Sequence, residues 1–119
     1  MKRMVVLLGC LVILGLISSP ASAAGNADAG KALFNDPKFA GGEKACNSCH
    51  PGGRGLEKAA DKKEFSIMGK TQKGLEEAIN FCIVNANKGK AIDLKSAQMK
   101  DMVAYIKSLK KKAPKSAGY

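Results

Sequence analysis

Residues 46 to 50 read Cys-Asn-Ser-Cys-His, and this C-x-x-C-H motif constrains the fold more than any other feature of the chain. Two thiols at this spacing can each form a thioether to a haem vinyl group, and the His that follows is placed to ligate the iron. A zinc site needs four ligands of the Cys or His type, whereas after residue 24 the chain has one further Cys and no further His. A thioredoxin-like dithiol belongs in a βαβ pattern, and the sequence has none. The motif therefore predicts one covalent haem c on Cys46 and Cys49, with His50 as the proximal ligand.

The first 24 residues have the layout of a secretory signal peptide. Two basic residues at positions 2–3 precede an uncharged apolar run over residues 4–17, and small residues complete the segment. This run is shorter than the roughly 20 residues that a membrane-spanning helix needs. We expect cleavage after Ala23 or Ala24, which gives a periplasmic protein with no stable membrane span.

The rest of the chain is expected to form one haem domain over residues 25–110, followed by a flexible Lys-rich tail over residues 111–119. A domain this small is marginal on its own hydrophobic core, and the chain has no Trp, 4 Phe and 2 Tyr. A buried haem would supply the missing apolar centre.

Basic residues outnumber acidic ones by 20 to 10 in the full chain. Cleavage would remove Lys2 and Arg3 and leave 18 against 10, a net charge of +8 before the haem propionates are counted. This charge favours redox partners with acidic surfaces, anionic substrates or a membrane surface, although a solvated lysine face would give the same composition. Export and the lack of a basic–aromatic stacking surface argue against nucleic acid. We expect a monomer.

Three helices are predicted around the motif, and no strand pattern competes with them. The first spans residues 27–35, with Asn26 or Asp28 as its cap. The second spans about residues 73–87 with an apolar stripe, and the third starts near Ser96. The predicted fold class is all-α, a small helical domain built around one covalent haem.

Two short segments on either side of the motif carry a family resemblance. Residues 30–34 read Gly-Lys-Ala-Leu-Phe and residues 103–106 read Val-Ala-Tyr-Ile, and together with the haem motif they resemble class I cytochrome c. In that family the first and last helices cross at a close contact. The resemblance covers nearly the whole chain after the leader, and it implies that Gly30 and Phe34 meet Tyr105.

The sixth iron ligand is the point at which the chain departs from that family. Class I cytochromes usually take a Met from the loop before the last helix, but residues 89–94 contain none. The chain leaves these candidates: Cys82, Met68, Met99, Met102, a Lys, or an open position.

Cys82 is the main candidate for this ligand, because it is the odd thiol in an oxidising compartment and lies on the apolar stripe of its predicted helix. A buried structural Cys or an intermolecular disulfide would also account for it. Met68, in a Gly-flanked polar segment, is the alternative ligand. Met99 and Met102 fit the buried stripe of the last helix, where core packing explains both.

A closer resemblance supports Cys82. Residues 78–82, 87–91 and 98–106 are similar to the His/Cys-ligated haem domain of thiosulfate dehydrogenases, and the haem subunits of sulfur-oxidising complexes look alike. In that subfamily the Cys that matches Cys82 ligates the iron and takes part in sulfur chemistry. The resemblance implies the same role here.

Two functions follow from these features. The first is a non-enzymatic carrier of single electrons, with no catalytic residue. The alternative is a thiosulfate-oxidising cytochrome or subunit that uses Cys82 at the haem. The carrier is favoured because the enzymes it resembles generally carry two haems and place arginines near them, whereas this chain has one C-x-x-C-H and, after the leader, only Arg54. A haem-based gas sensor is a more distant third.

Overall fold

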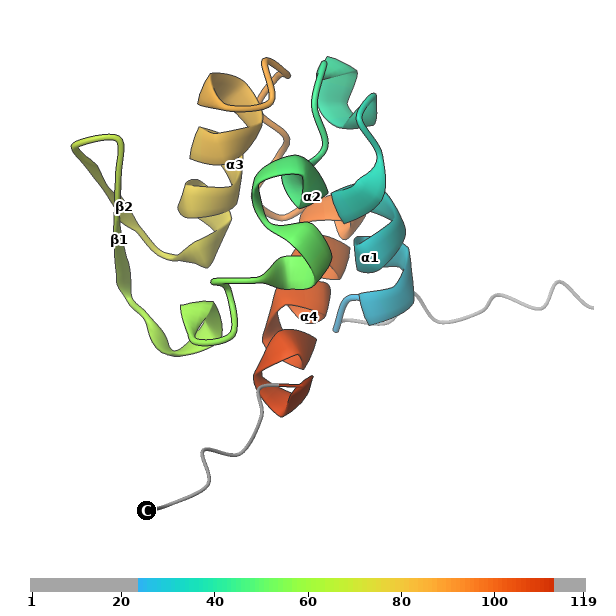
Figure 1. Ribbon diagram of the computed structural model, residues 1–119, viewed down its shortest axis with the longest axis vertical. Coiled ribbons are helices and arrows are strands. Elements are labelled where there is room, and N and C mark those ends of the chain that lie inside the picture. Colours follow the sequence, from blue (N-terminus) through green and yellow to red (C-terminus); the bar gives the residue numbers. More distant parts are fainter. Residues whose placement is uncertain (1–23, 113–119) are drawn as a thin grey trace, which may run out of the picture.

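The computed structural model describes residues 24–112. The predicted signal peptide up to residue 23 and the tail beyond residue 112 lie outside the described residues. Helices and one hairpin make up this part of the chain (Figure 1). In chain order the elements are α1 (Ala27–Asn35), η1 (Phe39–Gly41), α2 (Cys46–Cys49), η2 (Pro51–Gly53), η3 (Ala59–Asp61), β1 (Glu64–Ile67), β2 (Lys70–Lys73), α3 (Leu75–Asn85), α4 (Ala97–Leu109) and η4 (Lys110–Lys112), where η marks a short 3-10 helix.

Helix α1 packs across α4 through a contact that excludes any side chain at position 30. The helix begins after Asn26, whose side-chain oxygen accepts from the backbone N–H groups of Asp28 and Ala29 at 2.9 and 3.0 Å. A Cβ on Gly30 would overlap the backbone carbonyl of Asp101 and lie 2.9 Å from the Cβ of Tyr105. The expected crossing of the first and last helices is confirmed.

One turn further along α1, Phe34 completes this contact. Its ring lies 5.0 Å from the ring of Tyr105, centroid to centroid, with a tilt of 59° between the planes. Tilted pairs at this separation are a favourable aromatic arrangement. Both side chains are buried in the main hydrophobic cluster, so the crossing is part of the core.

Replacing Gly30 with Leu should therefore destabilise the haem-containing protein. Overpacking of a tight contact typically costs about 1–3 kcal/mol, and each kcal/mol lowers the Tm of a domain of this size by roughly 4–8 °C. Ala29→Leu is the matched control, since Ala29 is exposed on the same helix. Equal melting temperatures for Gly30→Leu and Ala29→Leu would contradict the close helix contact.

The all-α prediction is wrong over residues 64–73, which form an antiparallel hairpin. Glu64 pairs with Lys73 and Ile67 pairs with Lys70. Phe65 and Ile67 are partly buried while their neighbours are exposed, which is the alternation of a half-buried strand. Met68 and Gly69 form the turn with φ of 50° and 75°, and two positive φ values are what a type I′ hairpin turn requires. The structure is thus mostly helical with one small sheet.

The hairpin also shortens the second predicted helix. Lys73 pairs in β2, and Gly74 follows with a φ of 107°, so α3 begins at Leu75. Its α-helical residues end at Asn85, two residues before the predicted end. The first helix matches its predicted bounds, and α4 begins after Ser96, whose hydroxyl accepts from the N–H of Met99 at 3.1 Å.

The segment between α3 and α4 is fastened to α3 by one side chain. The Asn80 amide accepts from the N–H of Ile92 at 2.9 Å and donates to its carbonyl oxygen at 2.7 Å. The Asn80 side chain thus satisfies both the N–H and the carbonyl of Ile92, as a neighbouring β-strand would. The segment in which class I cytochromes usually carry their Met ligand is therefore held against α3, and Ile92 packs on the core.

The hydrophobic core is built mainly from three helices. The fully buried side chains Phe34, Ile83, Met99 and Met102 come from α1, α3 and α4. Figure 1 shows α3 and the hairpin on one side, α1 and α2 on the other, and α4 below and between them. Within residues 24–112, no helix has the length and apolar character needed to cross a membrane.

Candidate functional site

The C-x-x-C-H motif forms the one-turn helix α2 and the residue that ends it. The His50 N–H donates to the Cys46 carbonyl at 3.0 Å, and the backbone then leaves the helical conformation at His50. Cys46 and His50 both line a cavity, whereas Cys49, at the end of the same turn, is exposed and is not part of the lining. The turn thus presents one thiol and the imidazole to the cavity, with the second thiol beside them.

The orientation of the His50 ring is fixed by the turn that follows it. Nδ1 lies 3.0 Å from the backbone carbonyl oxygen of Arg54. A carbonyl can only accept, so Nδ1 carries the proton and donates it. The Nε2 lone pair is then free for a metal. A metal-ligating His commonly uses its other ring nitrogen in this way, which sets the tautomer and strengthens the ligand.

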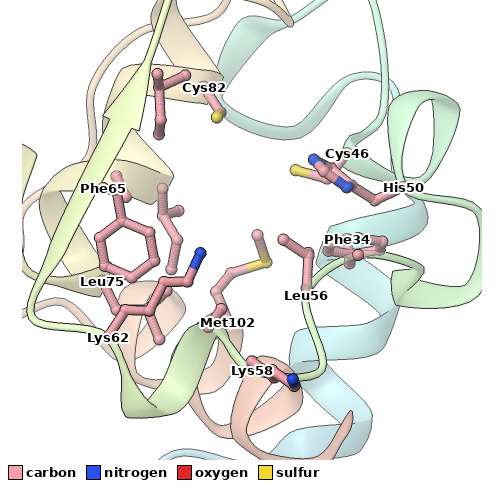
Figure 2. A pocket seen from close by; sticks show the side chains of 15 residues that line it. Phe34, Cys46, His50, Leu56, Lys58, Lys62, Phe65, Leu75, Cys82 and Met102 are labelled. Carbon is pink, nitrogen blue, oxygen red and sulfur yellow. The ribbon is translucent and has the colours of Figure 1, made fainter. Parts of the chain in front are cut away.

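The cavity in front of His50 has the wall of a cofactor pocket. Its volume is about 280 Å³, near the lower end of the roughly 300–1,000 Å³ of small-molecule and cofactor sites. Most of its wall is apolar, with contributions from Phe34, Leu56, Phe65, Leu75, Ile79 and Met102 (Figure 2). A flat apolar macrocycle with a covalent edge and an axial imidazole fits this combination of wall and donors, so the residues present fit haem c.

Cys82 reaches the same cavity from α3. Figure 2 shows its sulfur facing the space that His50 and Cys46 also border. Burial raises the pKa of the Cys82 thiol, and the nearby Cys46 and Cys49 raise it further. A thiol in such a place stays protonated on its own, while coordination to a metal deprotonates it outright. Cys82 as the distal ligand remains a prediction.

The other sixth-ligand candidates are placed differently. Met68 sits in the hairpin turn with 70% of its surface exposed, and it is not among the cavity-lining residues. Met99 is buried in the core and away from the lining. Met102 is buried and also lines the cavity, so it is both a core residue and part of the haem pocket wall.

Asn87 is a site residue that sequence reasoning missed. It has only 6% of its surface exposed, and its side-chain amide donates to the Cys46 sulfur at 3.3 Å. Its backbone carbonyl accepts from the N–H of Glu43 at 2.8 Å. Burial raises the pKa of the Cys46 thiol, and the Asn87 hydrogen bond opposes that rise. An Asn just past a helix end looks like an ordinary cap in sequence, and only the fold brings it to the motif.

Two lysines were also missed. Lys58 and Lys62 flank η3 and line the cavity. The sequence includes a Lys among the sixth-ligand candidates without singling out a position. Nothing in it separates Lys58 and Lys62 from the other lysines, because their place in the cavity depends on how η3 packs against α4.

The sequence matches a known protein family. Residues 29–114 match the family model described as the SoxA/TsdA cytochrome c domain. No curated protein and no solved structure gave a significant match. The matched segment contains the C-x-x-C-H motif, Cys82, α3, α4 and nearly all of α1. Since the match covers most of the chain, and agrees with the resemblance carried by the sequence, the chain belongs to the SoxA/TsdA cytochrome c domain family.

Proposed function

We propose that this protein is a periplasmic monohaem cytochrome that carries single electrons between redox partners. A cytochrome c domain of this family implies covalently bound haem c and redox partners. The observation that carries the proposal is the single C-x-x-C-H motif, whose imidazole faces an apolar cavity with its Nδ1 already held by the Arg54 carbonyl.

The chain's own residues perform a simple set of tasks in this function. When bound, the haem supplies the one-electron centre. Cys46 and Cys49 would hold it by covalent bonds, and His50 would ligate the iron through Nε2. The apolar wall keeps water from the ring, and this burial is one of the means by which a protein sets the potential of its haem.

The proposal includes the compartment and the partners. Residues 1–24 have the composition of a signal peptide, and thioether attachment outside the cytoplasm suits a C-x-x-C-H protein. The lysines outside the leader give the protein an excess of positive charge. Such a surface attracts acidic redox proteins and speeds their encounter.

A second function is favoured by the position of Cys82. Its thiol and His50 border one cavity, and the SoxA/TsdA family is linked to sulfur oxidation. A sulfur compound such as thiosulfate, if it entered this cavity, would meet the Cys82 sulfur beside the iron. The single haem motif and the lone Arg54 after the leader favour the carrier instead.

Mass spectrometry of the purified periplasmic protein tests the first function. It should find one haem on the peptide that contains Cys46 and Cys49, and a mature chain that begins at Ala24 or Gly25. The oxidised haem should then accept one electron from a redox partner and should not be reduced by thiosulfate alone. Alkylatable thiols at both motif cysteines would refute covalent haem. Turnover of thiosulfate would move the assignment to the second function.

A further inference from the structure

Two positive charges stand at one end of the haem cavity. Lys58 and Lys62 both line it, although both are exposed at its rim. Figure 2 shows Lys58 at the bottom of the cavity and the Lys62 ammonium directed into the middle of the space, both below Cys46 and Cys82. The neighbouring wall at this end includes Leu75 and Met102, which are apolar.

Neither ammonium has an acidic partner among residues 24–112. The ion pair found there joins Asp61 to Lys110 at 2.8 Å. Asp61 lies between Lys58 and Lys62 in sequence, and it is drawn toward the end of α4 by this pair. A Lys can lay its alkyl stem along an apolar wall while its charged head stays in water, so both ammonium groups keep their charge at the rim. The cavity therefore has a cationic end that no carboxylate of this region neutralises.

The chemistry of haem supplies two anions at that end. Haem carries its two vinyl groups on one edge of the ring and its two propionates on the opposite edge. Thioether bonds to Cys46 and Cys49 would fix the vinyl edge at α2. The propionates would then extend across the cavity, away from the motif, toward the end at which Lys58 and Lys62 lie.

We propose that Lys58 and Lys62 hold the two haem propionates and thereby fix the haem edge opposite the thioethers. The inference rests on the covalent haem of the proposed function, and it does not depend on whether Cys82 ligates the iron or on any sulfur chemistry. Two ammonium groups beside the propionates also stabilise the added electron of Fe(II), because their charge acts through a weakly polar wall. They should therefore raise the haem potential.

Lys58→Gln, Lys62→Gln and the double variant test this in the purified holoprotein. Each single variant should lower the midpoint potential, and the double variant should lower it further. The propionate bending band in the resonance Raman spectrum should shift in the same order. Lys62→Arg, which keeps the charge, should return both readings close to those of the unsubstituted protein.

Lys63→Gln is the matched control. Lys63 follows Lys62 in the chain, is exposed and is absent from the cavity lining. Its substitution by Gln removes the same charge. Its potential and Raman band should stay close to those of the unsubstituted protein. A double variant whose two readings equal those of Lys63→Gln would overturn the proposal. If the double variant fails to mature, the single variants decide by the same readings, whereas an unsubstituted protein without haem would refute the proposed function instead.

Discussion

Replacing Cys82 with Ala should open the sixth coordination position of the haem iron. The oxidised variant should bind added cyanide or imidazole quickly, whereas the unsubstituted protein should bind them slowly. The reason is that Cys82 borders the cavity that His50 faces, and Ala offers no ligand atom. Absorption spectra recorded after ligand addition, with electron paramagnetic resonance on the oxidised protein, measure the change.

Cys82→Met should keep the iron six-coordinate and raise its midpoint potential. A thiolate favours Fe(III) through its negative charge, and a neutral thioether does so much less. Met68→Ala is the control, and it should alter neither ligand binding nor potential, because Met68 lies exposed in the hairpin turn. If Met68→Ala opened the site while Cys82→Ala had no effect, Met68 would be the ligand and Cys82 an ordinary buried thiol.

The second large effect is expected from Cys46→Ser combined with Cys49→Ser. The purified variant should carry no covalent haem and should show no cooperative thermal transition. The haem cavity of about 280 Å³ would be left to collapse or fill with water. Loss of a single large core side chain costs about 2–5 kcal/mol, and a whole domain is stable by only about 5–15 kcal/mol.

Far-UV circular dichroism during heating gives the direct reading. Cys82→Ala serves as the control, since it also removes a cavity thiol but leaves both thioether positions intact. It should retain haem and a cooperative transition. A haem-free double variant that melts cooperatively at the temperature of the unsubstituted holoprotein would show that the polypeptide builds its core alone.

The helices at the two ends of the domain could be predicted from sequence because their signals are local. Asn26 caps α1 and Ser96 caps α4 through bonds to residues two or three positions away. The hairpin could not be predicted because its segment has no clear local signal. Its strands have four residues each, and its turn places Met68 at a positive φ without the Asn-Gly or Asp-Gly pair that usually marks such turns.

Part of the haem site could be predicted from the sequence, and part of it could not. Cys46, Cys49 and His50 lie within one short segment, residues 46–50, so their spacing alone predicts thioether attachment and an axial ligand. Asn87 reaches Cys46 across 41 residues of sequence, and Lys58 and Lys62 enter the cavity only because η3 packs against α4. Contacts of this kind depend on the tertiary fold and leave no pattern in a single sequence.

The two hydrogen bonds between the Asn80 side chain and the Ile92 backbone affect how fast the sixth ligand of the haem can exchange. In a protein whose sixth ligand comes from a loop, that ligand can exchange whenever the loop moves, on nanosecond to microsecond timescales. Here the corresponding loop is fastened to α3 by two hydrogen bonds, and Cys82 lies within that helix. A ligand donated from α3 leaves the iron only if a helix shifts or unwinds, which is a slower event. The architecture therefore suits a centre whose coordination stays the same while electrons come and go.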